Sequence, residues 1–315
     1  MSKSIAVFGG NGFLGRKICE VGINRGYNIT SYSRSGQPPN LHPHSHKQAQ
    51  PPSWINQVSW QKCDIFHPSQ SITPAQLSQF DTIIHSIGIL FEDASYKKSM
   101  NSNFGFLQDV QKLANRALGA GGSNPMQKDK VNSSYEAVQR DSAVLIADEY
   151  IKARMDAIKE KKKKKSKEKE VEGNAAVEDD LRTVVGNYVY ISADKNPPIV
   201  PQRYIITKRE AEFELSNKPH LRSILMRPGI MYEEKSGYPS QDSDDSVTNR
   251  DVLVKGLQLG YSLKNAVLGN QFLSGLVRPV VSTTQVANAI FDKLEDEEFR
   301  GGVVPVEEIE QKTTF

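Results

Sequence analysis

A tyrosine and a lysine that could take part in proton transfer lie four residues apart, at Tyr204 and Lys208. On a helix this spacing puts both side chains on one face. A tyrosine hydroxyl can donate a proton to a reacting oxygen, and a neighbouring ammonium stabilises the phenolate that remains. Such a pair also arises by chance, so its position twelve residues after Ser192 carries the inference. The pattern predicts a proton-donating site in which Ser192 binds a substrate oxygen.

Three evenly spaced glycines, Gly9, Gly12 and Gly15, follow an apolar run and open a helical pattern. In this context the first glycine permits a tight turn, the second admits a pyrophosphate and the third lets the helix pack closely. The helix N-terminus then offers N–H donors to the phosphates. We therefore predict a dinucleotide site that includes Phe13 and Leu14. The alternative is a glycine-rich turn that binds nothing.

The residues after the second expected strand favour NADP(H), with NAD(H) as the second choice. NAD-binding chains place an acid there, but no acidic residue occurs between Glu20 and Asp64. Arg34, flanked by Ser33 and Ser35, suits a 2′-phosphate, although a solvated loop charge is the alternative. Asp64, followed by Ile65, is a candidate for the adenine amino group, or else a turn residue.

Apolar runs that indicate strands alternate with helical patterns. The expected strands span residues 5–8, 28–33, 58–63, 82–86, 189–192 and 223–226, and the expected helices span residues 13–22, 135–158, 204–215 and 285–294. Alternation of this kind predicts an α/β fold. We expect a Rossmann-type doubly wound parallel sheet with a small C-terminal substrate lobe.

The expected domains are a nucleotide-binding domain over residues 1–230 and a C-terminal lobe over residues 231–315, in one globular unit. Residues 159–180, a lysine run followed by an acidic stretch, are predicted to be a disordered, solvated insertion. Contact of this run with anionic lipid is the alternative. Residues 36–53 and 92–133 are expected to be polar loops.

Composition limits the function classes. The 315 residues are 37% hydrophobic and 24% charged, as in ordinary soluble proteins. No run reaches 18 apolar residues, and two cysteines cannot form a disulfide framework. Residues 151–170 hold ten bases and four acids, or +6, so the net charge of +3 leaves −3 elsewhere. Because a nucleic-acid binder carries its charge on a folded face, we expect no nucleic-acid partner.

Three further features have ordinary explanations. We expect no metal at His42, His44 and His46, because the surrounding loop lacks further ligands. The apolar helix expected over residues 252–268 could meet a membrane or a quinone-like ligand, but core of the lobe is the default. We expect neither a secretory signal nor a separate transit peptide ahead of the first strand.

Several motifs together resemble a family of enzymes, the atypical, extended short-chain dehydrogenase/reductases of the epimerase-like kind. The motifs are the glycine turn of residues 7–15, His85-Ser86-Ile87-Gly88, Ser192, Tyr204-x-x-x-Lys208 and Arg227-Pro228-Gly229. More narrowly, residues 33–36, 85–90, 190–195 and 208–212 are similar to a fungal mitochondrial family associated with coenzyme Q biosynthesis, and to the reductase-like accessory subunit of respiratory complex I. The resemblance runs from Ser4 to about Glu308.

The resemblance implies roles for particular residues. Ser86, Gly88, Arg227 and Pro228 would border the cofactor, with Arg227 mainly structural. The family often completes a proton relay with an asparagine where this chain has Gln139, a departure that puts the relay in doubt. Arg203 and Arg209 are expected to be exposed charges beside the helix that carries Tyr204.

Three functions remain open at this stage. The first is a mitochondrial NADP(H)-dependent reductase of the ubiquinone pathway, peripheral on the matrix side of the inner membrane. It would act on a quinone-like or isoprenoid molecule beside proteins of the coenzyme Q complex. The second is a non-catalytic, nucleotide-binding scaffold subunit of an inner-membrane complex. The third is a reductase of sugars or secondary metabolites outside mitochondria.

Overall fold

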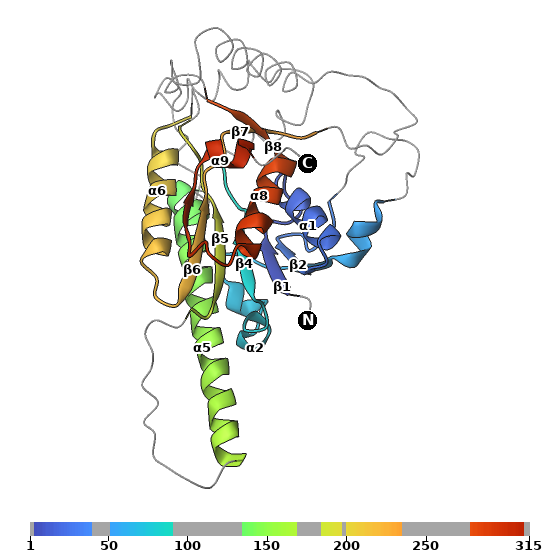
Figure 1. The fold of residues 1–315 in the computed structure, drawn as a ribbon, viewed down its shortest axis with the longest axis vertical. Helices are drawn as coiled ribbons and strands as arrows, with labels where there is room; N and C mark the ends of the chain where they lie inside the picture. Colours follow the sequence, from blue (N-terminus) through green and yellow to red (C-terminus); the bar gives the residue numbers. More distant parts are fainter. Residues whose placement is uncertain are drawn as a thin grey trace, which may run out of the picture.

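The computed structural model describes residues 3–39, 51–90, 134–168, 184–196, 200–234 and 278–311. Its centre is a seven-stranded sheet, all parallel, in the order β3-β2-β1-β4-β5-β6-β9 (Figure 1). The strands are β1 (Ser4–Phe8), β2 (Asn28–Ser33), β3 (Ser59–Lys62), β4 (Thr82–His85), β5 (Gly186–Ile191), β6 (Leu221–Met226) and β9 (Gly302–Val304). The first six have the order of a dinucleotide-binding fold, so the predicted Rossmann-type sheet is confirmed.

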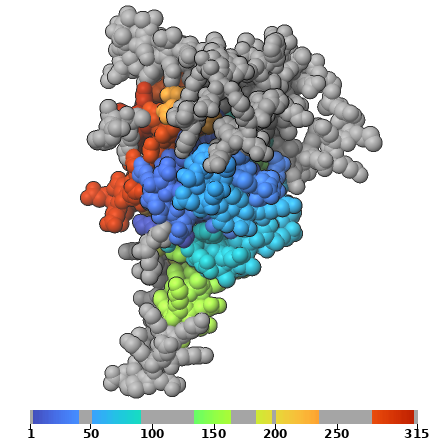
Figure 2. Space-filling model, turned by 90° about the vertical axis from the view of Figure 1, so that its right-hand side faces the viewer, coloured from blue at the N-terminus to red at the C-terminus, as the bar shows by residue number. Residues whose placement is uncertain are grey.

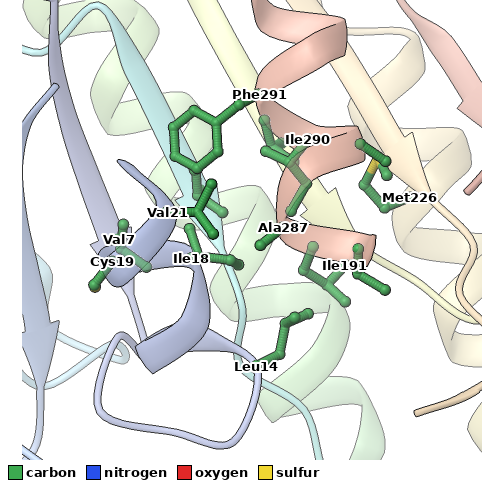
Figure 3. Packing of buried hydrophobic residues seen from close by; sticks show 14 of the residues in the cluster. Val7, Leu14, Ile18, Cys19, Val21, Ile191, Met226, Ala287, Ile290 and Phe291 are labelled. Carbon is green, nitrogen blue, oxygen red and sulfur yellow. The ribbon is translucent and has the colours of Figure 1, made fainter. Parts of the chain in front are cut away.

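Side chains of successive strand residues enter two separate cores, as expected for a sheet covered on both faces. Ile5 and Val7 join a cluster with helices α1 (Gly15–Asn24), α8 (Thr283–Glu295) and α9 (Val306–Gln311). Figure 3 shows Ile18 and Val21 of α1, and Leu14 just before it, in this cluster with Ala287, Ile290 and Phe291 of α8. This packing fixes the helix that leaves the glycine turn.

The second core lies on the opposite face. Ala6 and Phe8 pack there with the long helix α5 (Ser142–Glu168), α6 (Arg203–Ser216) and the short α2 (Pro74–Leu77). A π-helical segment, η4 (Glu136–Asp141), leads directly into α5. The remaining elements are η1 (Ser53–Gln57), η2 (Pro68–Gln70) and a two-stranded parallel sheet of β7 (Ile230–Tyr232) and β8 (Val280–Ser282).

The helix predicted over residues 135–158 continues ten residues further, to Glu168. The first part of the expected disordered insertion is therefore helical. Its composition explains this, since residues 159–168 contain only lysine, glutamate and one serine, with no glycine or proline. Figures 1 and 2 show the distal part of α5 projecting beyond the other coloured elements. Lys161, Lys162 and Lys163 are exposed there, which agrees with the expected solvation.

The boundary expected at residue 230 does not separate the sheet from a lobe. Strand β9 is the last strand of the main sheet, and α8 packs against its core. The predictions for His42, His44 and His46, and for residues 92–133 and 252–268, lie outside the described residues. Within the described ranges no helix has the length and apolar character to cross a membrane, and no cluster of three metal-ligating side chains occurs.

Candidate functional site

The candidate site lies where β1 and β4 end side by side. The two strands pair in parallel, with Phe8 opposite His85, so their exits meet at the carboxyl edge of the sheet. The chain order reverses direction here, because β2 lies on one side of β1 and β4 on the other. Doubly wound folds bind their ligands at such a point. The glycine turn follows β1, and Ser86 and Gly88 follow β4.

The three glycines of the turn differ in what surrounds them. Gly9 has a φ of +90°, which favours glycine. A Cβ on Gly15 would lie 2.0 Å from the carbonyl oxygen of Gly9, so that position cannot carry a side chain. Among the described residues, a Cβ on Gly12 would meet only that same oxygen, at 3.1 Å. The protein itself thus requires Gly9 and Gly15, whereas Gly12 keeps an exposed face open, as a pyrophosphate needs.

Helix α1 begins directly behind this open face. Its N-cap is Leu14, whose apolar side chain cannot hydrogen-bond the free N–H groups of the first turn. Leu14 is buried in the core. Phe13 is half-buried, and the guanidinium of Arg16 lies 5.9 Å from the centre of its ring. Arg16 also forms an ion pair with Glu233, just after β7. These residues fit a bound dinucleotide, with the phosphates against the turn.

The exit of β2 presents polar groups next to the turn. The Oγ of Ser33 accepts the N–H of Gly36 at 3.1 Å, and the Oγ of Ser35 accepts from the Nδ2 of Asn11 at 3.1 Å. These bonds tie this exit to the glycine turn. Arg34 is exposed and has no ion-pair partner among the described residues. Contact of its guanidinium with a 2′-phosphate stays a prediction.

Asp64 is exposed just beyond β3, and its Oδ1 accepts the N–H of Phe66 at 3.1 Å. Its carbonyl oxygen accepts the N–H of His67 at 3.1 Å. Asp64 thus serves as a turn residue, which was one of its two predicted roles. Ile65 is buried in the second core. An adenine contact at Asp64 remains a prediction.

Lys208 extends from α6 to the exits of β4 and β5. Its Nζ donates to the carbonyl oxygen of Ile191 at 2.7 Å and lies 4.8 Å from the ring centre of Tyr190. A Cβ on the exposed Gly88 would lie 3.4 Å from this Nζ. Burial lowers the pKa of Lys208 to about 7, and Glu212 opposes the shift. Near neutral pH both forms of the amine are therefore populated.

Tyr204 lies one helical turn before Lys208, and both side chains are buried. Its ring meets that of Tyr135 edge to face, with centroids 6.0 Å apart. Ala193 and Val200 complete a small cluster around it, with Ile89 and Leu90 from the exit of β4. The structure thus brings Tyr204 to the same edge of the sheet as the glycine turn, although its role as an acid stays a prediction.

Gln139 lies within the π-helical segment, a type of distortion that is frequent at functional sites. Its side chain is fully buried, and its Nε2 donates to the carbonyl oxygen of Ile89 at 3.3 Å. Its Oε1 has no hydrogen-bond partner among the described residues. Its backbone carbonyl accepts the hydroxyl of Tyr190 at 2.8 Å. Tyr190 therefore links Gln139 to Lys208.

His85, at the end of β4, is also fully buried in this region. Its Nε2 lies 3.1 Å from the Oγ of Ser142, and its ring lies 5.8 Å from that of Tyr190. Burial, together with the nearby charge of Lys208, lowers the pKa of His85 to about 3. The imidazole is thus neutral at physiological pH, so His85 contributes packing and a hydrogen bond but no charge.

Ser192 is held by an arginine that the sequence did not assign to the site. Arg209 donates to the Ser192 Oγ at 3.1 Å and to the carbonyl oxygens of Ala193 and Asp194 at 2.8 and 2.7 Å. Arg209 was expected to be exposed, which is wrong, because its side chain is only 33% exposed and turns inward. Arg203 is 58% exposed, as predicted, and pairs with Glu136.

Glu212, almost fully buried, joins two strand exits. It accepts from Arg209 at 2.7 Å and from Arg227 at 2.9 and 2.5 Å. The N–H of Arg227 donates to Val304, and the carbonyl of Pro228 accepts the N–H of Asp194 at 2.9 Å. Arg227 thus has the structural contacts expected of it, and its place beside the cofactor stays a prediction. No sequence motif predicted this network. The only sequence feature that could have suggested it is a glutamate on the expected helix with arginines at positions 209 and 227.

The sequence was compared with protein families and with curated proteins. Residues 5–130 match the NAD dependent epimerase/dehydratase family. The MIOREX complex component 2 of Saccharomyces cerevisiae is 34% identical over 312 residues, which cover 98% of this chain and 99% of the relative. This chain belongs to the same family as that yeast protein. The predicted resemblance to extended, epimerase-like reductases is thereby confirmed.

Other similarities are shorter or more distant. An uncharacterised chloroplastic protein of Arabidopsis thaliana is 39% identical over 66 residues, 21% of this chain and 19% of the relative. A variant of ElxO with NADPH bound is 14% identical, with a TM-score of 0.46, covering 99% of this chain and 100% of that one. WbmF of Bordetella bronchiseptica, in complex with NAD+, is 13% identical, with a TM-score of 0.47 and coverages of 97% and 73%.

Proposed function

We propose that this protein binds NADP(H) at the glycine turn and reduces a carbonyl group of a quinone-like or isoprenoid molecule. The reaction belongs in or beside ubiquinone biosynthesis. The protein works in mitochondria, peripheral to the matrix side of the inner membrane, with proteins of the coenzyme Q complex. The sequence similarity to the coenzyme Q-associated fungal family supports the pathway and the location. The name of the yeast relative, a complex component, supports an assembly with other proteins.

One observation carries the reductase proposal: the open glycine and the reactive side chains share one edge of the sheet. Gly12 offers its free face after β1. The Lys208 amine lies close to Gly88, after β4, and Ser192 follows β5. A dinucleotide extended from the turn along this edge would bring its nicotinamide end towards the lysine, as in doubly wound folds generally.

Each reactive side chain has one task in the proposal. When bound, NADPH supplies a hydride to the carbonyl carbon. Tyr204 donates its hydroxyl proton to the carbonyl oxygen, so that an alcohol forms and a phenolate remains. The Lys208 ammonium stabilises this phenolate, and solvent protons restore the hydroxyl. Ser192 donates a hydrogen bond to the same substrate oxygen.

A second function, a nucleotide-binding scaffold, is favoured by how the reactive groups are occupied. Lys208 donates to Ile191, and burial depresses its charge. Gln139 stands where a relay asparagine is common in the family, and its amide already contacts Ile89. A protein that has lost catalysis but still binds its nucleotide would retain the glycine turn, and hydrogen bonds that engage Lys208 and Gln139 internally would not impair it.

Complementation of cells that lack the protein tests the two functions. Tyr204→Phe keeps the ring, and Lys208→Met keeps most of the stem, so both variants should fold and bind NADPH. If the protein is a reductase, neither variant restores normal ubiquinone and its intermediates. If it is a scaffold, both do, while Gly12→Val does not. Full rescue by the double variant at wild-type abundance would exclude the reductase.

A further inference from the structure

The guanidinium of Arg209 is saturated by acceptors around the exit of β5. Its Nη1 donates to the Oγ of Ser192 and to the Oε1 of Glu212, at 3.1 and 2.7 Å. Its Nη2 donates to two backbone carbonyls, those of Ala193 and Asp194. These four bonds use all four terminal N–H groups. The planar group therefore has one orientation, in which an N–H points at the serine oxygen.

The acceptors themselves are fixed from a second side. Glu212 is only 4% exposed and is also held by Arg227, at the exit of β6. The N–H of Ser192 donates to Met226 at 2.8 Å, and the Asp194 carboxylate accepts from Arg278. Arg209 is thus clamped between α6 and two strand exits. A network with every member paired holds its geometry better than isolated contacts do.

The fixed N–H determines what the serine hydroxyl can do. A hydroxyl has one hydrogen to donate and lone pairs that accept. Because Arg209 donates to the oxygen, the serine hydrogen must point elsewhere. Among the described residues no acceptor receives it, although the side chain is almost fully buried. The positive charge beside the oxygen also makes the hydroxyl a stronger hydrogen-bond donor.

We propose that Arg209 is a positioning residue that fixes the Ser192 hydroxyl as a hydrogen-bond donor. The site then selects a substrate atom that accepts at this point, such as a carbonyl oxygen or the oxyanion formed from it. A substrate nitrogen with only hydrogens to offer would be rejected there. This inference rests on the proposed reductase function and names the chemistry of one substrate atom.

A thiol at position 192 reports on the guanidinium without any turnover. Ser192→Cys places a titratable sulfur where Arg209 donates, and the ultraviolet absorbance of its thiolate gives its pKa. A cation in contact lowers the pKa of such a thiol by about 1–3. Cys19 and Cys63 are buried with raised pKa values, about 11 for Cys63, and the parent protein provides the baseline.

The decisive comparison removes the charge. Ser192→Cys with Arg209→Gln keeps hydrogen-bond donors near the Ala193 and Asp194 carbonyls but loses the cation, so the thiol pKa should rise by at least about 1. Arg209→Met is the second variant and should give the same rise. Arg203→Gln is the matched control, because this exposed arginine on the same helix does not touch Ser192. It should leave the thiol pKa unchanged.

Equal thiol pKa values with and without Arg209 would overturn the proposal. An arginine that acts only through its bonds to Glu212 and the backbone carbonyls, and not on the side chain at position 192, would leave the thiol pKa where it is. The titration therefore separates these two roles even if stability falls. The titration is also independent of catalysis. If NADPH oxidation with a quinone probe is absent while the thiol pKa rises as expected, the reductase function fails and the placement of Arg209 stands.

Discussion

The two halves of the candidate site differ in how their polar groups are engaged. The nucleotide half, formed by residues 9–15 and 33–36, leaves its ligand-facing groups open: Gly12 has a free face, and Arg34 has no ion-pair partner among the described residues. The reactive half, formed by residues 192–194 and 204–212, engages its groups internally. Lys208 donates to Ile191, and the Ser192 oxygen accepts from Arg209.

This difference has an energetic meaning. A nucleotide can occupy the first half without breaking any hydrogen bond described there. A substrate in the second half must fit groups that already have partners, and each internal hydrogen bond it replaces costs about 0.5–1.5 kcal/mol. Nucleotide binding therefore requires fewer changes to this fold than the proposed catalysis, which would depend on how a substrate uses the remaining donors.

The largest expected effects come from substituting two glycines of the same turn, Gly15 for stability and Gly12 for NADPH affinity. Gly15→Ala puts a Cβ 2.0 Å from the Gly9 oxygen, so the backbone must shift and the free energy of unfolding should fall by about 3 kcal/mol. At Gly12 a Cβ meets just one oxygen of the described residues, at 3.1 Å, so Gly12→Val should cost at most about 1 kcal/mol. It should nonetheless weaken NADPH binding at least about 100-fold, or 2.7 kcal/mol.

Denaturant unfolding and fluorescence titration with NADPH measure the two effects. The glycine interpretation requires that stability falls mainly at Gly15 and affinity mainly at Gly12. Undiminished NADPH binding by folded Gly12→Val protein would mean that the pyrophosphate does not approach the turn.

The next effect tests the buried amine of the reactive half. Burial lowers the pKa of Lys208 to about 7, which corresponds to up to about 4 kcal/mol of lost stability at neutral pH. Lys208→Met removes this cost but also the hydrogen bond to Ile191 and the contact with Tyr190, worth about 2 kcal/mol together. The nucleotide-free variant should thus be about 2 kcal/mol more stable at pH 7.

The pH dependence has a definite sign. Since the pKa of Lys208 is lower in the folded than in the unfolded protein, the unfolded chain binds more protons between about pH 7 and 10. Wild-type stability should therefore gain on the variant across that window, and the advantage of Lys208→Met should shrink. Urea unfolding at several pH values measures it, with the exposed Lys152→Met as control. If the difference in unfolding free energy between wild type and Lys208→Met did not change with pH, burial would not be lowering the pKa of Lys208.

The sequence could predict some features of these two halves and not others. Short-range sequence patterns were enough to predict the glycine turn. They also predicted the strand of residues 28–33 with its exact bounds. The sequence did not predict that Lys208 lies near Gly88, although the fold class places both residues at the carboxyl edge of the sheet. The partners of Arg209 did not follow, because Ser192, Glu212 and Arg227 meet only once β5, α6 and β6 are packed.

The π-helical segment escaped prediction for a related reason. Its residues have ordinary helical patterning, and tertiary contacts of Gln139 with Ile89 and Tyr190 accompany the distortion. The end of α5 was missed in another way. Charge density suggested disorder, whereas the helix propensity of lysine and glutamate extends the helix to Glu168.

A smaller effect concerns the choice of dinucleotide. Arg34→Ala removes a guanidinium that would pair with the 2′-phosphate, so NADPH affinity should fall about tenfold, or 1.4 kcal/mol, while NADH affinity changes little. Lys159→Ala, an exposed base on α5, controls for the loss of one charge. Parallel titrations with both dinucleotides give the ratio. An unchanged NADPH affinity would remove Arg34 from the site.

The smallest expected effect is at the far end of α5. Deletion of residues 161–172 should leave the melting temperature nearly unchanged, because no α5 side chain described beyond Ala153 is buried and Lys161–Lys163 are exposed. Altering the connection length by a factor of two changes the closure cost by only about 0.6 kcal/mol. Ile146→Ala, in the packed half of the same helix, should instead cost about 2–5 kcal/mol. Thermal unfolding compares the two variants directly. A fall for the deletion as large as for Ile146→Ala would show that the lysine-rich end packs on the fold, and both sections of α5 would then be structural.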